Sequence, residues 1–207
     1  TDLKVYSEVL QDAVFDLIDA GKISFASGTS LTVSPDFEEH YKANFENYRD
    51  KIMLRPQEIS NHPEVIRRLG IIAMNTAIEA DIYGNVNSSH INGTRIMNGI
   101  GGSGDFAQNA GLSIFMTPST AKNGTLSCIV PFITHVDHTE HDIHFLVTEY
   151  GYADLRATTP KERARKIIDT CAHPDFRPML HDYLDRACAQ CAHKHTPQLL
   201  NEVFQGK

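Results

Sequence analysis

The sequence lacks any apolar run long enough to cross a membrane. A spanning helix needs about 20 consecutive apolar residues, and no stretch of the 207 residues approaches that length. The first residues, Thr1–Lys4, also lack the apolar segment of a signal peptide. We therefore expect no membrane contact and a cytoplasmic location, or the mitochondrial matrix if the source is a eukaryote.

Cysteine and basic side chains are scarce as well. Four cysteines, at positions 128, 171, 188 and 191, are too few and too unevenly placed for a disulfide scaffold, which predicts a reducing compartment. The chain has 19 basic against 26 acidic residues and a net charge of −7, which argues against a nucleic-acid binder. It begins with Thr1 rather than Met, so we expect it to be a piece of something longer.

Apolar periodicity and terminal caps predict the order of secondary structure. We expect helices over residues 7–20, 34–48, 63–69, 105–110, 161–168, 178–191 and 199–204. We expect strands within 24–33, 52–54, 71–83, 86–91, 112–116, 128–130 and 145–147. Strands mixed with helices, followed by helices alone, predict the α/β class: an open mixed β-sheet flanked by helices, with a helical C-terminal tail.

The most distinctive stretch is the glycine loop, Gly99–Phe106, which reads G-I-G-G-S-G-D-F. It matches the dinucleotide fingerprint G-x-G-x-x-G literally, but it lacks a convincing strand before it, a full helix after it and an acidic residue about 20 positions later. A set of backbone N–H groups open to an approaching oxygen remains. The alternative is a tight turn that simply requires small residues.

Six strings together resemble the acetyl-CoA hydrolase/transferase family, the class I CoA-transferases. They are Tyr6–Glu8, Glu58–Glu64, Asn75–Asn87, Asn98–Phe106, His135–Asp142 and Val147–Arg156. The resemblance is greatest to the succinyl-CoA:acetate and propionyl-CoA:succinate CoA-transferases, and it runs from Tyr6 to about Ala187. It implies a C-terminal catalytic domain over residues 1–187, a helical tail over 188–207, and an N-terminal domain that this chain does not contain.

The resemblance also implies a mechanism in which a glutamate, Glu8 here, attacks an acyl-CoA thioester and later carries CoA as a glutamyl thioester. A carboxylate can act this way when the attack geometry is fixed and water is excluded. We expect Glu8 at the start of the first helix, where the positive end of the helix dipole favours the ionised form. The alternative interpretation is an ordinary acidic residue in a first helical turn.

Further site residues follow from the same resemblance. It implies that Gly102 donates its backbone N–H to the oxyanion, that Asn61 positions the thioester or acyl carboxylate, and that Asn98, Gly102, Ile78 and Lys122 contact CoA. From the residues alone, Asn61 is also a helix N-cap, Ile78 a strand residue and Lys122 a solvated loop lysine.

Two clusters imitate metal sites. The segment His135–His144 holds seven possible ligands in ten positions, but the resemblance attaches no metal to it, and such side chains often hold loops. Cys188 and Cys191 have no second pair to complete a tetrahedral site, so we interpret them as incidental thiols. Glu79 and Asp81 fall on one face of a strand, as an acid/base pair or a hydrogen-bonded edge. We expect no metal.

The sequence thus predicts the C-terminal part of an acyl-CoA:carboxylate CoA-transferase for short-chain carboxylates such as acetate, propionate and succinate. Acetyl-CoA hydrolase and a non-catalytic CoA-binding fragment are the alternatives. The expected partners are acyl-CoA, a carboxylate, the N-terminal domain of the same enzyme and a second copy in a homodimer. Because that domain is missing, we expect the isolated chain to be inactive.

Overall fold

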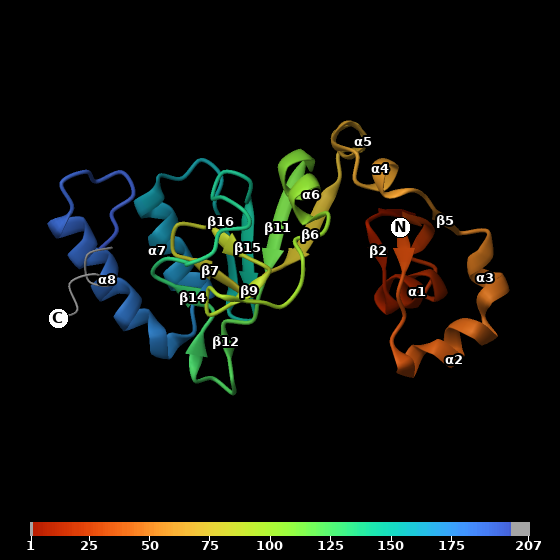
Figure 1. The fold of residues 1–207 in the computed structure, drawn as a ribbon, viewed down its shortest axis with the longest axis horizontal. Helices are drawn as coiled ribbons and strands as arrows, with labels where there is room; N and C mark the ends of the chain where they lie inside the picture. The colour runs from red at the N-terminus through yellow and green to blue at the C-terminus, as the bar shows by residue number, and fades with distance from the viewer. Residues whose placement is uncertain (1, 200–207) are drawn as a thin grey trace. The chain divides into compact units, whose positions relative to one another are not determined.

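The computed structural model describes residues 2–199 and divides the chain into two compact units, Thr1–Ile71 and Ile72–Lys207 (Figure 1). Each unit is considered by itself. Of the predicted helix over 199–204, residues 200–204 lie outside the described residues, and Leu199 is not helical.

The first unit is built on a parallel sheet of three strands in the order β1 (Leu3–Tyr6), β3 (Ile23–Gly28) and β5 (Ile52–Leu54). Beside it, β2 (Val9–Leu10) pairs in parallel with β4 (Ser30–Leu31). Five helices accompany the strands: α1 (Asp12–Asp19), α2 (Pro35–Ala43), α3 (Phe45–Arg49), α4 (Gln57–Ser60) and α5 (Pro63–Leu69).

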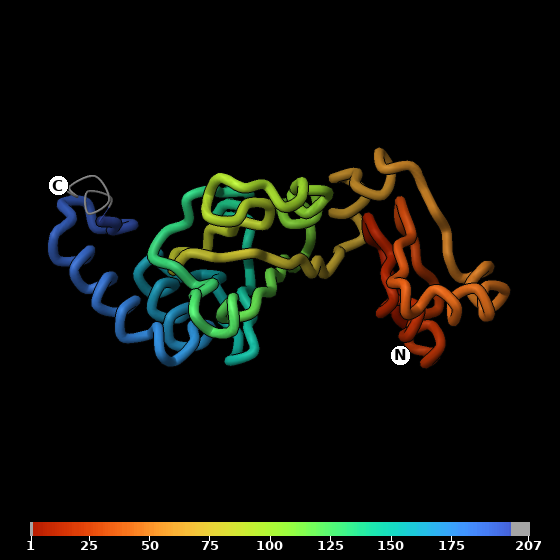
Figure 2. Tube along the Cα trace, turned by 60° about the horizontal axis from the view of Figure 1, so that its bottom comes forward, coloured from red at the N-terminus to blue at the C-terminus, as the bar shows by residue number. Residues whose placement is uncertain are grey.

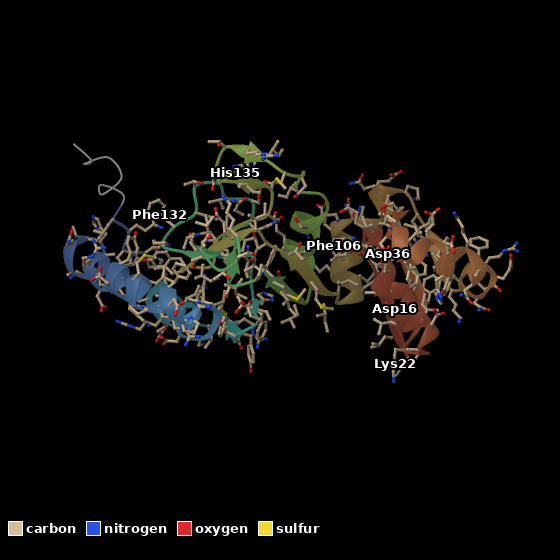
Figure 3. The ribbon with its side chains drawn as sticks, turned by 90° about the horizontal axis from the view of Figure 1, so that it is seen from below. Asp16, Lys22, Asp36, Phe106, Phe132 and His135 are labelled. Carbon is tan, nitrogen blue, oxygen red and sulfur yellow. The ribbon has the colours of Figure 1, made fainter. Side chains whose placement is uncertain are left out.

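Aromatic side chains fill the core of this unit. Phe15 of α1 is fully buried, and Tyr41 and Tyr48 meet its ring edge-on at centroid distances of 5.2 and 5.1 Å. Such edge-to-face pairs each add about 0.5–1.5 kcal/mol beyond the burial of apolar area. At the surface, Lys22 lies in the turn between α1 and β3 and points outward (Figure 3).

The predicted first helix over residues 7–20 begins too early. The structure has α1 at Asp12–Asp19, and residues 3–10 form β1, a bend at Glu8, and β2. Val9 and Leu10 fit a helical stripe by spacing, but they pair with Ser30 and Leu31 of β4. That long-range pairing overrides the local helical pattern.

The second unit contains a four-stranded sheet in the order β16 (Gly151–Asp154), β15 (Phe145–Thr148), β11 (Leu112–Met116) and β6 (Ile72–Thr76). β6, β11 and β15 are parallel, and β16 is antiparallel. One face carries fully or nearly fully buried side chains, among them Phe115 and Leu146. The expected open, mixed sheet is confirmed.

Short strands surround this sheet. β7 (Glu79–Asp81) pairs with β8 (Val86–Asn87) across the predicted turn and with β14 (Ile129–Val130). β9 (His90–Ile91) pairs with β10 (Arg95–Ile96), and β12 (Thr120–Ala121) with β13 (Leu126–Ser127). Residues 85–102 form a looped segment on one side of the unit (Figure 2), which leads into α6 (Ser103–Asn109).

Two long helices follow the sheet, as the sequence predicts. α7 (Pro160–Cys171) packs against β15 and β16, and it begins with a capping box between Thr159 and Glu162. A short 3₁₀ turn, Pro174–Phe176, leads to α8 (Arg177–Gln190), which passes through the predicted domain boundary at residue 187. Residues 191–199 are not helical, and the predicted tail beyond them lies outside the described residues. The division at residue 187 stays a prediction.

Candidate active site

Glu8 lies just beyond the carboxyl end of β1, in the bend that leads into β2, and is half-buried. Its carbonyl oxygen accepts the backbone N–H groups of Thr29 and Ser30, at 2.7 and 3.1 Å, from the turn that follows β3. Ligands of open parallel sheets bind outside the carboxyl ends of the strands. Glu8 is therefore held by the backbone at the edge of the sheet where such sites form.

The expected helix position of Glu8 is wrong. Glu8 precedes Asp12, the first residue of α1, by four positions and lies in a bend between two strands. The helix dipole acts within the first turn of a helix, so the expected effect of α1 on Glu8 does not apply. The ends of β1 and β3 fix the position of the Glu8 backbone instead.

Gly28, the last residue of β3, allows the chain to pass close to the Glu8 backbone. A Cβ atom added at Gly28 would lie 3.0 Å from Leu10 Cγ and 3.2 Å from the Glu8 carbonyl oxygen. The first contact is with a fully buried side chain and the second with backbone, so neither can yield freely. The position requires glycine because of this close approach.

Gly28→Ala is therefore expected to lower the free energy of unfolding by about 1–3 kcal/mol, the usual cost of overpacking. Because it displaces Glu8, it should also reduce the turnover that the family resemblance assigns to that residue. Chemical denaturation and steady-state kinetics measure the two effects. Gly99→Ala is the matched control for stability, since a Cβ atom there meets nothing within 4 Å. Equal stability of the two variants would show that the Leu10 contact relaxes without cost.

Asn61 directly follows α4, and its side chain is an unusual polar group of the first unit. The residue is 7% exposed, yet neither its Nδ2 nor its Oδ1 atom has a hydrogen-bond partner among residues 2–199. The fully buried Ser60 hydroxyl beside it is unpartnered in the same way. Leaving a buried polar group unsatisfied costs about 1–3 kcal/mol, so these groups need a reason other than stability.

The alternative role of Asn61 as a helix N-cap is wrong. The cap of α5 is His62, whose Nδ1 accepts the Glu64 N–H at 3.2 Å, while Asn61 is the C-cap of α4. The imidazole can cap because His62 has the extended backbone of an N-cap residue. The Asn61 amide therefore has no role in either helix end.

The glycine loop belongs to the second unit, and its first residues together with Asn98 are exposed up to Gly101, whereas Gly102 is buried. The Asn98 side-chain amide donates to the carbonyl oxygens of Ser88 and Gly99, at 2.9 and 3.0 Å. Gly101 has φ 57°, a left-handed conformation that favours glycine, and Gly102 is the N-cap residue of α6. The tight-turn interpretation accounts for Gly101 but not for Gly99, where a side chain would find open space.

The other two predicted CoA contacts lie in hairpins. Ile78 stands between β6 and β7, and its N–H donates to the Asn87 carbonyl at 2.9 Å, so a further main-chain contact would use its carbonyl oxygen. Lys122 occupies the exposed turn between β12 and β13 with φ 49°. The predicted loop at this position is thus the tip of a β-hairpin.

The predicted site residues fall into two sets. Glu8 and Asn61 belong to the first unit, Glu8 just beyond the carboxyl end of β1 and Asn61 directly after α4. Ile78, Asn98, Gly102 and Lys122 belong to the second unit. Their assignment to one site stays a prediction.

Sequence reasoning missed the side chains that hold the glycine loop. Ser103 Oγ donates to the Ile100 carbonyl at 2.7 Å and lies 3.0 Å from Nε2 of His138. His138 is 2% exposed, and burial lowers the pKa of its imidazole despite the nearby carboxylates of Asp137 and Asp142. The only sequence signal was the position of His138 inside the histidine-rich segment.

Asp137, the residue before His138, holds the segment Ser88–Ser89 by hydrogen bonds. One carboxylate oxygen accepts the Ser88 N–H at 2.8 Å and the Ser89 hydroxyl at 2.6 Å. Burial raises the pKa of the Asp137 carboxyl, but hydrogen bonds from Ser89 and Ser88 help to outweigh that effect and hold the pKa below its usual range. Asp137 is therefore an ionised acceptor that ties two loops together.

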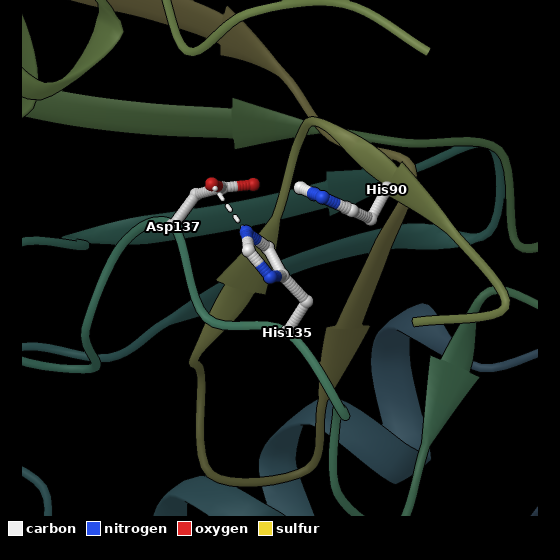
Figure 4. A group of neighbouring side chains, drawn as sticks. All are labelled: His90, His135 and Asp137. Carbon is white, nitrogen blue, oxygen red and sulfur yellow. Dashed lines mark hydrogen bonds and ion pairs between the residues drawn. The ribbon is translucent and has the colours of Figure 1, made fainter. Parts of the chain in front are cut away.

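His90, His135 and Asp137 offer ligand atoms within 4.8 Å of one another (Figure 4). The carboxylate already accepts from His135 Nε2 at 3.1 Å, and the His90 and His135 ring centroids lie 3.6 Å apart with the ring planes tilted by 34°. Metal coordination requires free lone pairs that converge on one point, whereas His135 Nε2 is bonded to Asp137 and His90 Nδ1 lies 2.8 Å from the Ser89 hydroxyl. The group fits a hydrogen-bonded loop contact better than an ion site, and the expected absence of a metal stays a prediction.

Glu79 and Asp81 both accept hydrogen bonds from neighbouring residues. Glu79 accepts from the side-chain amide of Asn87 at 3.0 Å. One Asp81 carboxylate oxygen accepts the backbone N–H groups of Tyr83 and Asn85, each at 2.9 Å. Burial raises the pKa of the Asp81 carboxyl against these hydrogen bonds. The pair therefore supports the β7–β8 turn, in line with the hydrogen-bonded alternative.

Comparison with known proteins decides the family. The family model described as "Acetyl-CoA hydrolase/transferase C-terminal domain" matches residues 38–184. The chain belongs to the acetyl-CoA hydrolase/transferase family. The expected resemblance is therefore confirmed, and the model covers Asn61, Ile78, Asn98, Gly102 and Lys122, while Glu8 precedes its first matched residue.

Relatives in this family include both transferases and hydrolases. The chain is 54% identical over 203 residues to a succinyl-CoA:acetate CoA-transferase of Clostridium kluyveri, covering 98% of this chain and 38% of the relative. It is 52% identical over 211 residues to an acetyl-CoA hydrolase of Schizosaccharomyces pombe, covering 99% and 40%. The chain thus spans about two fifths of the length of these curated relatives.

Among solved structures, a 4-hydroxybutyrate CoA-transferase from Porphyromonas gingivalis matches with a TM-score of 0.71 and 30% identity, over 90% of this chain and 46% of the other. This agrees with the predicted fold class. Between residues 2 and 199, no helix combines the length and apolar character needed to cross a membrane.

Proposed function

We propose that this chain is the C-terminal part of an acyl-CoA:carboxylate CoA-transferase that moves CoA between short-chain carboxylates through a glutamyl-CoA thioester on Glu8. The observation that carries the proposal is the position of Glu8, which the backbone holds just beyond the carboxyl end of β1 in a chain that belongs to this family. In the same unit, the Asn61 amide is buried without a partner among the described residues. Relatives named as CoA-transferases support the reaction class.

The proposed chemistry balances without an external reagent. The Glu8 carboxylate attacks the thioester carbonyl, the carbon–sulfur bond breaks, and a mixed anhydride and CoA thiolate result. The thiolate then attacks the glutamyl carbonyl, which releases the acyl group as a carboxylate and leaves CoA on Glu8 as a thioester. An incoming carboxylate reverses both steps.

Each attack passes through a tetrahedral oxyanion, which a positioned N–H donor stabilises. We assign this donor to Gly102, the N-cap residue of α6. The Asn61 amide would then satisfy its orphaned polar atoms against the thioester or acyl carboxylate. A buried polar group that waits for substrate explains why the fold tolerates its cost.

CoA fits the residues assigned to it in the second unit. Asn98 and the open space at Gly99 would accommodate the pantetheine end, with Ile78 in main-chain contact. Lys122 presents an exposed cation on a hairpin tip, which suits a phosphate.

Covalent labelling tests the mechanism directly. The whole protein that contains this chain is incubated with acyl-CoA, treated with hydroxylamine or borohydride, and digested for mass spectrometry. A hydroxamate or a reduced side chain at Glu8 is expected, because both reagents attack the glutamyl thioester. Modification at another carboxylate, or none at all, would sink the mechanism.

Hydrolysis of acetyl-CoA is the second candidate, favoured by the relatives named as hydrolases. The two reactions share the CoA thioester on Glu8. In the transferase an incoming carboxylate attacks this thioester and takes up CoA, whereas in the hydrolase water attacks it and CoA is released. Which reaction occurs depends on how well the closed site excludes water. Product analysis with labelled acetate and acetyl-CoA separates them. A transferase forms labelled acetyl-CoA, whereas a hydrolase releases free CoA at the same rate with or without acetate.

Gly99→Ala probes the loop without disturbing the fold. The added methyl group meets no protein atom within 4 Å, so we expect unchanged thermal unfolding. If the loop lines the CoA site, the methyl group intrudes on the ligand and raises KM for acyl-CoA by about tenfold, the equivalent of about 1.4 kcal/mol. An unchanged KM would remove Gly99 from the site.

The remaining parts of the proposal concern the whole protein. Since the chain spans 38–40% of these relatives, we propose that an additional domain completes the substrate cleft and that the isolated chain turns over acyl-CoA slowly or not at all. Full-rate turnover by the isolated chain would contradict this. We further propose a homodimer located in the cytoplasm or, in a eukaryote, the mitochondrial matrix.

A further inference from the structure

Side-chain hydrogen bonds hold the glycine loop near both of its ends. Their partners are Ser88 and His138, which lie next to each other. At its start, the Asn98 amide donates to the Ser88 carbonyl at 2.9 Å. At its end, Ser103 Oγ donates to the Ile100 carbonyl at 2.7 Å and lies 3.0 Å from His138 Nε2. The backbone between these anchors carries Gly102.

The direction of the Ser103–His138 hydrogen bond follows from counting protons. A serine hydroxyl has one hydrogen to donate, and Ser103 gives it to the Ile100 carbonyl. Toward His138 the Ser103 oxygen therefore accepts, so Nε2 carries the hydrogen. The Ser88 hydroxyl lies 3.4 Å from the same Nε2 and can direct its own hydrogen to the Asp137 carboxylate, so it is a longer, second acceptor. A neutral imidazole protonated on Nε2 meets this requirement, and the surroundings favour a neutral ring, which is 2% exposed and packs 4.8 Å from the Phe115 ring.

His138 is itself held rigidly. Its backbone N–H donates to the Val86 carbonyl at 3.0 Å, and its carbonyl accepts the Val86 N–H at 2.9 Å. The preceding residue, Asp137, accepts from Ser88 and Ser89 through one carboxylate oxygen. The imidazole thus projects from a segment locked to β8, across to the first residue of α6.

We propose that His138 is a positioning residue that donates from Nε2 to Ser103 and thereby fixes the backbone N–H of the adjacent Gly102 for catalysis. The proposal rests on the proposed function, in which Gly102 stabilises the oxyanion. A displacement of about 1 Å at a reacting centre can cost up to about 100-fold in rate, so a distant hydrogen bond can matter to chemistry without touching the substrate.

Two pairs of variants in the whole protein test the link. His138→Leu and Ser103→Ala remove the donor and the acceptor, whereas His138→Gln replaces imidazole Nε2 with an amide nitrogen that can still donate. His141→Leu is the matched control, because His141 lies in the same segment with its side chain 80% exposed. Thermal unfolding identifies any variant that fails to fold, and Ser103→Ala, at a half-buried site, is the milder change.

We expect His138→Leu and Ser103→Ala to lower kcat by about 10- to 100-fold, with KM for acyl-CoA changed less than threefold. The double variant should be no worse than the poorer single one, because both changes break one link. His138→Gln should recover most of kcat, and His141→Leu should match the unaltered protein. Amide hydrogen exchange over residues 99–103 should accelerate in His138→Leu, and nitrogen NMR should find His138 protonated on Nε2.

Three results would overturn the inference: unchanged exchange of the loop in folded His138→Leu, no rescue by His138→Gln, or a proton on Nδ1 in place of Nε2. These outcomes leave the labelling of Glu8 untouched. Conversely, a labelled site elsewhere than Glu8 would end the proposed mechanism, while the exchange and tautomer measurements would still report on the link between His138 and the loop.

Discussion

Glu8→Ala is expected to abolish CoA transfer, with kcat/KM reduced on the order of 10⁴-fold or more, or at least about 5.4 kcal/mol of lost transition-state stabilisation. The variant removes the carboxyl group on which both the anhydride and the thioester form in the proposed mechanism. Steady-state transfer assays on the whole protein measure the loss. Glu8→Asp keeps the carboxylate but withdraws it by one methylene, which should leave about 1% of the rate.

The matched control is Glu39→Ala, which removes an exposed carboxylate from α2 in the same unit. It should retain full activity, and all three variants should unfold at similar temperatures because Glu8 is only half-buried and its backbone carbonyl keeps the hydrogen bonds from Thr29 and Ser30 in each variant. Glu8→Ala with more than a tenth of the original rate would exclude Glu8 as the nucleophile.

Asn61→Leu is expected to make the protein more stable and less active at once. The Asn61 amide is buried without a partner among the described residues, so an apolar side chain of similar volume removes an unsatisfied group and should add about 1 kcal/mol to the free energy of unfolding. This corresponds to a rise in Tm of about 2–4 °C for a protein of this size. Transfer should fall about 100-fold, as when one oxyanion donor is removed.

Opposite signs for stability and activity distinguish a substrate-binding amide from a structural one. A structural amide would give a loss of both, and a bystander would give a gain in stability with unchanged kcat. Asn61→Asp is a useful companion, because burying a carboxylate at this position should lower both stability and activity.

Local signals predicted the helix boundaries that depend on a few neighbouring residues. Ser34 caps α2 by accepting the Phe37 N–H at 3.3 Å, and Gly70 ends α5 with φ 62°, both as the sequence indicates. Both features act within one helical turn, so no knowledge of the distant chain is needed.

Pairing between distant segments could not be predicted in the same way. β1 was missed and the first helix was begun at residue 7, because the partners of Leu3–Tyr6 lie in Ile23–Gly28 and nothing local indicates the pairing. Asn61 looked like the N-cap before Pro63, yet one residue later His62 has the required backbone and a suitable nitrogen. Local patterns locate a cap to within about a residue, not to the atom.

The candidate site shows the same division. Glu8, Asn61 and Gly102 were predicted because they lie in strings that resemble a family; the family is confirmed, and the roles of these residues stay predictions. The link between Ser103 and His138 joins residues 35 positions apart. It depends on where the fold places a buried imidazole, which sequence spacing does not encode.

The cysteines affect how the labelling experiment can be read. Cys128 and Cys171 are buried, and burial raises the pKa of both thiols. Since the thiolate is the reactive form, neither is poised to capture an acyl group from acyl-CoA by thiol exchange. Cys188 and Cys191, half-buried at the end of α8, are the thiols to block or replace first. Once these two thiols are blocked, hydroxylamine-sensitive acyl adducts on peptides of this chain report on carboxylates rather than on thiol exchange.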